Sequence, residues 1–156
     1  MKKQEISVQT KKKLAKLFLT TGEAELQVEL LRQNLCKVTS FEPYASFQRI
    51  DRLAKGYITA RDLLHFMRDN GYDATEENEC KHVCRYFDAS AEDRLHYIDY
   101  LQILLPCDQP FLRAQATQRP TYPVEKDSFL PYEVEQGLAK LIGRELKLAR
   151  DVELLK

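Results

Sequence analysis

The sequence is poor in several residue types, and each shortage narrows the range of functions. It has no tryptophan and only 5 glycines in 156 residues. So few glycines argue against the glycine-rich loops that cradle phosphates and against a fold built from tight hairpins. Lysine plus arginine and aspartate plus glutamate each total 24, so the formal net charge is zero. This balance gives no general reason to expect nucleic acid or an anionic membrane as a partner.

Long apolar runs and dense cysteines are missing as well. No stretch approaches the roughly 18 apolar residues of a membrane span, and the first residues lack the apolar core of a secretory signal. The four cysteines, Cys36, Cys80, Cys84 and Cys107, are scattered and do not form a disulfide framework. With hydrophobic residues at 44% and charged residues at 31%, we expect a soluble globular domain with free thiols in a reducing compartment, the cytoplasm.

Apolar residues do recur at helical spacing along most of the chain, which predicts an all-α fold. Segment 1–41 predicts N-terminal helices, with a break at Thr20-Thr21-Gly22 between them. The first carries Leu14, Leu17 and Phe18 behind a lysine run, and the second carries Leu26, Leu30, Leu31 and Leu35 on one face. Four further helices are predicted over residues 42–50, 60–69, 75–87 and 97–105.

The prolines divide the rest of the chain. Five of the six lie between Pro106 and Pro131, so we expect 106–130 to form an extended strap that lies on its own domain or on a partner. An amphipathic helix is predicted over 131–156, although Glu145 falls inside its apolar arc. The helical pattern has no stop signal, which leaves open whether the helix ends frayed or continues in a longer protein.

Two stretches of the predicted helical block share one pattern, "IDRLAKGYITARDL" and "FDASAEDRLHYIDY". Counted from Asp51 in the first and from Asp88 in the second, each has an apolar residue at position 8. Each also has an aspartate at position 12, Asp62 and Asp99 respectively. A predicted helix precedes and follows each stretch.

On these residues, segment 42–105 resembles a pair of degenerate EF-hands of the calmodulin superfamily. The resemblance implies two helix–loop–helix units packed face to face, with their loops joined in a short ribbon through Ile58 and Leu95. The segment that follows, "LPCDQPFLRAQATQRP", is similar to EF-hand proteins of ciliated protists. The calcium loops of this family supply oxygens from positions 1, 3, 5, 7, 9 and 12, with glycine at position 6.

The first loop has lost the ligands that calcium needs. Position 3 is Leu53, which has no side-chain oxygen, and position 5 is Lys55, whose positive charge would repel the ion. Gly56 keeps the turn at position 6. We therefore predict an ion-free loop in which Lys55 takes the place of the ion and bridges Asp51 and Asp62.

The second loop keeps more ligands but has Asp93 at the position of the turn glycine. It predicts either one weakly bound Ca²⁺ or Mg²⁺ or a vestigial loop whose acids face solvent, and we expect no other cofactor. The candidate metal ligands are Asp88, Ser90, Glu92, the carbonyl of Arg94, and Asp99.

Other chemistry has little support in the sequence. Cys80 and Cys84 would share a helix face from which His82 points away, too few ligands for structural zinc. No nucleophile, phosphate-loop or metalloprotease motif is present, so we do not expect an enzyme.

We therefore expect a non-catalytic structural or protein-interaction adaptor, calcium-independent, in a cytoskeletal or ciliary assembly. Its partner would be a helix in a groove, and the predicted helix 131–156 could fill that groove itself or dock on a neighbour. Two alternatives are a calcium sensor that uses the loop Asp88–Asp99 and a regulatory fragment of a larger enzyme. The candidate partner-binding residues are Leu63, Phe66, Met67, Leu101, Leu104, Leu138, Leu141 and Val152.

Overall fold

The computed structural model describes residues 8–155, with the side chains of Leu17, Phe18, Thr20, Leu154 and Leu155 left out. Expectations for residues 1–7, for Lys156 and for those five side chains lie outside the described part. The described chain is mainly helical, and the all-α fold class is as predicted. Its helices are α1 (Val8–Lys37), α2 (Pro43–Ile50), α3 (Ala60–Asp69), α4 (Glu77–Phe87), α5 (Tyr97–Leu104), α6 (Pro110–Thr117) and α7 (Tyr132–Leu155).

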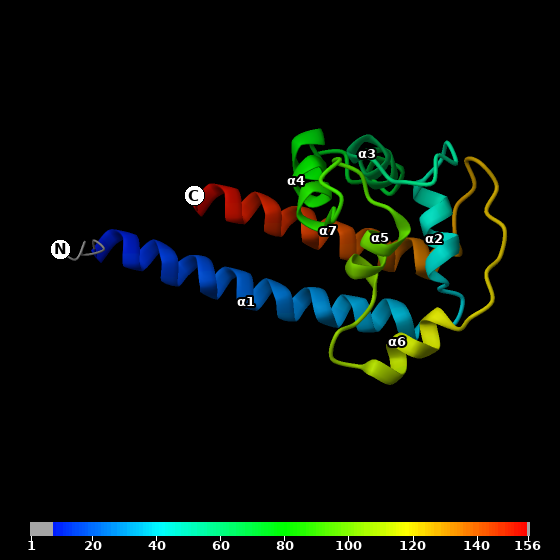
Figure 1. Cartoon of the computed structure of the whole chain (residues 1–156), viewed down its shortest axis with the longest axis horizontal. Helices are drawn as coiled ribbons and strands as arrows, with labels where there is room; N and C mark the ends of the chain where they lie inside the picture. The colour runs from blue at the N-terminus through cyan, green and yellow to red at the C-terminus, as the bar shows by residue number, and fades with distance from the viewer. Residues whose placement is uncertain (1–7, 156) are drawn as a thin grey trace.

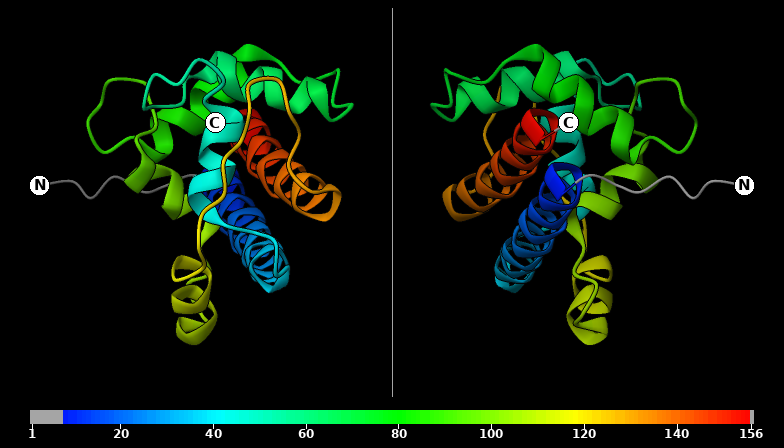
Figure 2. Two further views of the ribbon diagram at one scale, coloured as in Figure 1. Left: turned by 90° about the vertical axis from the view of Figure 1, so that its right-hand side faces the viewer. Right: turned by 90° about the vertical axis from the view of Figure 1, so that its left-hand side faces the viewer.

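The two long helices, α1 and α7, run antiparallel and form the base of the molecule, with α2–α5 stacked on one side of them (Figure 1). End-on views show the same arrangement, with α6 set apart beside α1 (Figure 2). Gly137 lets α7 approach α1 closely, because a Cβ at this position would lie 3.1 Å from the side chain of Leu35. A continuous core between the layers holds Val28, Leu35, Phe66, Leu104 and Leu138, among others.

Helix α1 corrects the predicted pair of N-terminal helices, because it continues through Thr20, Thr21 and Gly22 without a break. A glycine inside a helix costs only about 1 kcal/mol, and packing of α1 on α7 offsets that cost. The predicted face was also wrong in part. Leu31 packs on the core, whereas Leu26 and Leu30 are exposed to solvent.

The four middle helices were predicted with few errors, because their ends carry local signals. The Glu42 carboxylate accepts hydrogen bonds from the backbone N–H groups of Tyr44 and Ala45 and so caps α2. Thr59 and Asp62 form a capping box at the start of α3. Gly71 follows α3 with φ +86°, the left-handed conformation expected after a helix.

The loops α2–α3 and α4–α5 lie side by side and exchange two backbone hydrogen bonds. The N–H of Ile58 donates to the carbonyl of Leu95 and the reverse bond also forms, each at 2.8 Å. This antiparallel bridge is the pairing that the sequence predicted through these two residues. Both side chains are fully buried, so the bridge joins the loops over the core.

The segment 106–130 is not a continuous extended strap, because α6 forms inside it. Pro110 stands in the first turn of that helix, where a missing N–H costs nothing. The remainder does lie on its own domain. Arg119 donates to the carbonyls of Cys36, Val38 and Phe41 and so covers the C-terminal end of α1.

A buried arginine ties the N-terminus of α7 to α2 and α3. Arg49 is only 3% exposed, and its guanidinium lies 2.7 Å from Glu135 on α7 and 3.2 Å from Asp69 at the end of α3. The same guanidinium stacks on the rings of Phe66 and Phe129. Glu135 is also buried and accepts the N–H of Leu130.

We expect Arg49→Met to lower the free energy of unfolding by about 3–5 kcal/mol, because it leaves the carboxylate of Glu135 buried without its partner. Urea denaturation followed by circular dichroism would measure the loss. Arg52→Met is the matched control. It removes a partly exposed pair with Asp127 and should cost less than about 1 kcal/mol. Equal losses in the two variants would contradict the structural role given to Arg49.

Candidate functional site

The paired loops adopt one backbone shape in both units. The fourth residue of each loop is left-handed, with φ +51° at Ala54 and +57° at Ala91. The sixth is left-handed as well, with φ +86° at Gly56 and +59° at Asp93. Asp93 therefore occupies a turn that glycine enters without strain, at a cost on the order of 1 kcal/mol.

In the first loop a lysine supplies the positive charge. The Lys55 ammonium lies 2.8 Å from the carboxylate of Asp62. The Asp51 carboxylate accepts the backbone N–H groups of Lys55 and Gly56 at 3.0 and 2.8 Å. The predicted bridge is therefore present in modified form, with the Lys55 side chain bound to Asp62 and the Lys55 backbone bound to Asp51.

In the second loop the chain wraps its own N–H groups around Asp88. The carboxylate accepts the hydroxyl and N–H of Ser90 and the N–H groups of Glu92 and Arg94, at 2.6 to 3.2 Å. These hydrogen bonds hold the pKa of Asp88 well below its usual range, and the bond from the Ser90 hydroxyl has the largest effect on it. The carboxylate therefore stays ionised at any ordinary pH.

The other predicted ligands of the second loop have partners of their own. Glu92 lies 3.8 Å from the guanidinium of Arg94, and Asp99 accepts the N–H groups of Ala89 and His96. Within residues 8–155, no three His, Cys, Asp or Glu side chains are grouped so as to hold a metal ion. Ion binding by this loop stays a prediction.

Three of the four thiols are buried, and Cys107 is exposed. Burial raises the pKa of Cys36 to about 11 and the pKa of both Cys80 and Cys84 to about 12. Because the thiolate is the reactive and metal-binding form, these three cysteines act as core residues.

The residues predicted to bind a partner lie mostly inside the domain. Leu101 is half-buried, and Val152 is half-buried near the end of α7. The other six, Leu63, Phe66, Met67, Leu104, Leu138 and Leu141, are fully buried in the core. At Gly143 of α7 a Cβ would lie 3.3 Å from the Met67 side chain. Helix α7 thus covers the face of α3 and α4, which is one of the two arrangements that the sequence left open for the C-terminal helix.

Val152 instead lines an open apolar groove of about 390 Å³ between α1, α4 and α7. Val83 and Phe87 of α4 face Leu148 and Ala149 of α7 across this groove. Tyr86, 78% exposed, stands at its edge. The groove differs from the covered face of α3 because nothing in the described chain fills it.

Acidic side chains from two helices surround the groove, with Glu25 from α1 and Glu145 and Glu153 from α7. Glu145 is only 5% exposed and lies 3.4 Å from the Arg32 guanidinium. Burial raises the pKa of Glu145 to about 7, against the opposing effect of Arg32. The signal for this residue was its position inside the apolar arc of the C-terminal helix.

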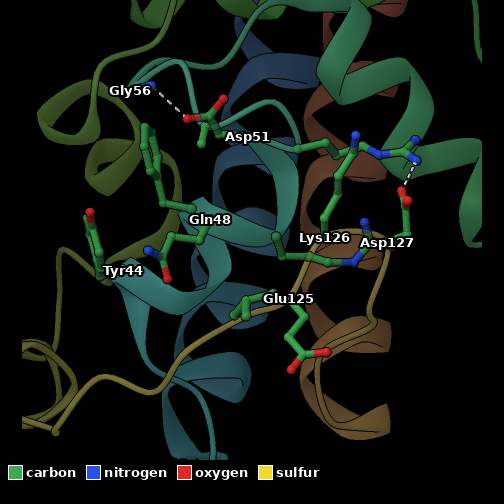
Figure 3. Close-up of a pocket in the computed structure, with 12 residues that line it drawn as sticks. Tyr44, Gln48, Asp51, Gly56, Glu125, Lys126 and Asp127 are labelled. Atoms are coloured by element: carbon green, nitrogen blue, oxygen red, sulfur yellow. Dashed lines mark hydrogen bonds and ion pairs between the residues drawn. The ribbon is translucent and has the colours of Figure 1, made fainter.

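A second crevice, of about 250 Å³, lies between α2, the first loop and the segment 124–127 (Figure 3). Two polar contacts between residues of its lining are present. Arg52 binds Asp127, and Asp51 binds the N–H of Gly56. The pair of Arg52 and Asp127 therefore fastens the strap to the first loop.

Comparison with family models, curated proteins and solved structures finds no match to this chain. Function must therefore be inferred from the loops and the groove themselves. Among the described helices, none combines the length and the apolar character that a membrane crossing requires.

We expect Glu145→Gln to change how stability depends on pH. The carboxyl has a pKa of about 7 in the fold against an ordinary 4.5. Its stabilising contribution is therefore complete below pH 4.5 and is lost as pH rises through 7. From pH 5 to pH 8 the free energy of unfolding should rise by about 2 kcal/mol for the variant relative to the wild type. Urea denaturation at both pH values would measure it.

Glu133→Gln is the control for this change, because Glu133 is exposed on the same helix. If the two substitutions altered the pH dependence equally, burial of the Glu145 carboxyl would not be its cause.

Proposed function

We propose that this protein is a non-catalytic, calcium-independent interaction module built on two EF-hand-like units. The observation that carries the proposal is the Lys55 ammonium, 2.8 Å from the carboxylate of Asp62 in the first loop. In a working calcium loop this last position is the chief acidic ligand. In this loop the ammonium of Lys55 already neutralises the charge of the Asp62 carboxylate.

Electrostatics explain why a lysine and a calcium ion exclude each other in this loop. Two like unit charges about 4 Å apart repel by about 4 kcal/mol at an effective dielectric constant of 20, and a divalent ion doubles that figure. Lys55 would have to leave both the loop and Asp62 before an ion could enter. Leu53 offers no replacement ligand.

The position of α7 supports the same proposal. In calcium sensors of the EF-hand type, an ion opens a hydrophobic groove for a partner helix. In this chain α7 packs against α3 and α4 and buries Leu138 and Leu141. A helix of the same chain is a constant ligand, so the fold has no need of an ion to set its shape. Such a module acts as a fixed scaffold whose partners are proteins that bind elsewhere on its surface.

The cellular setting is part of the proposal on the ground of sequence resemblance to EF-hand proteins of ciliated protists. It places the module in a cytoskeletal or ciliary assembly. Imaging of the tagged chain in a ciliated cell, together with mass spectrometry of co-purified proteins, would test this setting. A diffuse distribution with no cytoskeletal protein among the co-purified ones would count against it.

The second loop favours one alternative, a calcium sensor with a single working loop. Asp88 is ionised and already encircled by N–H groups of its own loop. In that alternative, Asp88→Ala combined with Asp99→Ala would abolish a calcium-dependent gain in partner binding. If the wild type and the double variant each bind the partner equally well with and without calcium, the alternative fails.

We expect isothermal calorimetry to show no calcium binding by the wild type at concentrations on the order of 10 micromolar. The triple variant Leu53→Asp, Lys55→Asp and Asp62→Glu should gain one site, because the turn at Gly56 is already in place and the ligands are restored. The gain should be seen both as heat and as a rise in thermal stability.

Arg61→Asp is the matched control for the triple variant. It makes the same charge change as Lys55→Asp at a loop position that supplies no ligand, on a largely exposed side chain. Equal gains in the control and the triple variant would point to a general charge effect. A micromolar calcium transition in the wild type would overturn the proposal.

A further inference from the structure

The N-terminal turns of α1 form a basic arm that no other part of the described chain covers. Residues 8–16 continue past the end of α7 (Figure 1). From residue 8 to residue 22 the helix carries four lysines, Lys11, Lys12, Lys13 and Lys16, and no acidic residue. Leu14 on this arm is 39% exposed. An apolar residue among lysines on an isolated helix end is a surface that a partner could cover.

Helical spacing aligns Leu14 with the groove on α1. At about 100° per residue, Thr21 and Glu25 each fall within about 20° of Leu14 around the helix. Thr21 and Glu25 line the groove. Lys11 and Lys13 flank Leu14 on either side, whereas Lys12 and Lys16 point to the opposite side of the helix. Arm and groove therefore share one face of α1 and are adjacent along it.

The charges of the two surfaces are opposite. The groove has an apolar floor with the exposed Glu25 and Glu153 at its rim, and His82 is the only lining residue with a basic side chain. The arm offers the reverse, an apolar residue with lysines on both sides. A lysine stem can cover apolar surface while its ammonium reaches a carboxylate.

We propose that the groove of one copy of this chain receives the basic arm of a second copy, so that two α1 helices cross antiparallel in a two-fold dimer. Leu14 of each copy enters the partner copy's groove, between the residues of α4 and those of α7. Lys11 and Lys13 then meet the acidic rim.

The two-fold arrangement follows from the placement of arm and groove. A rotation about an axis perpendicular to α1, midway between Leu14 and the groove residues Thr21 and Glu25, carries the arm of one copy onto the groove of the other and the reverse. Both contacts form at once, so the interface closes after two copies. This inference goes beyond the proposed function, because it concerns a surface outside the loops and holds whether or not an ion binds there.

Sedimentation equilibrium of the full chain would test the dimer. We expect the wild type to dimerise reversibly, more weakly at 0.5 M salt than at 0.05 M because the rim charges are exposed. Lys11→Glu with Lys13→Glu should raise the dissociation constant about tenfold or more, since like charges then face each other. Lys12→Glu with Lys16→Glu makes the same charge change on the opposite side of the arm and should have little effect.

A charge swap makes the test specific. The arm variant is Lys11→Glu with Lys13→Glu, and the groove variant is Glu25→Lys with Glu153→Lys. The groove variant should weaken the dimer as the arm variant does. Glu23→Lys should not, because Glu23 points away from the groove. Mixed in equal amounts, the arm variant and the groove variant should form a heterodimer, because each arm then meets a groove of opposite charge. Circular dichroism of each variant would establish that it is folded.

A monomeric wild type at about 1 mM and low salt would overturn the inference. So would equal effects of the two lysine pairs, or a mixture that stays monomeric while both variants are folded. Binding of calcium by the wild type would overturn the proposed function but would not bear on the dimer. Failure of the proposed function can therefore be distinguished from failure of the dimer inference.

Discussion

The structure depends on one buried charge, the guanidinium of Arg49. Its partners come from the end of α3 and the start of α7, and its faces are covered by Phe66 and Phe129. A charge removed from water is tolerated only where partners and hydrogen bonds replace the lost hydration. Helices α2, α3 and α7 and the segment before α7 must therefore meet at this point together. This constraint makes the C-terminal helix part of the domain.

The sequence predicted the middle of the fold well because its signals there are local. The capping groups of α2 and α3 and Gly71 can be recognised within a few residues, whereas the pairing of Ile58 with Leu95 was implied by the resemblance to paired EF-hands. Long-range packing decided the other elements. Helix α1 passes through Thr20–Gly22 because α7 lies against it. The burial of Arg49 and Glu145 depends on partners more than 80 residues away, and periodicity gives only a hint of it.

The candidate sites were predicted unevenly for the same reason. The contact of Lys55 with Asp62 was predicted from the residue types at fixed loop positions, and the structure contains it. Most of the predicted partner-binding residues proved to be core, because the sequence left open whether the C-terminal helix would cover them. The open groove gathers residues from α1, α4 and α7. No single stretch of sequence could have revealed it.

The antiparallel contact of α1 with α7 also bears on how the chain folds during synthesis. These helices stand at opposite ends of the described sequence, so the core that they share can close only after α7 has been made. Until then, Val28 and Leu35 of α1 have no apolar surface on α7 to pack against. Contacts this distant in sequence slow folding and leave apolar surface exposed in intermediates. A nascent chain of this protein would therefore need protection from aggregation until α7 emerges from the ribosome.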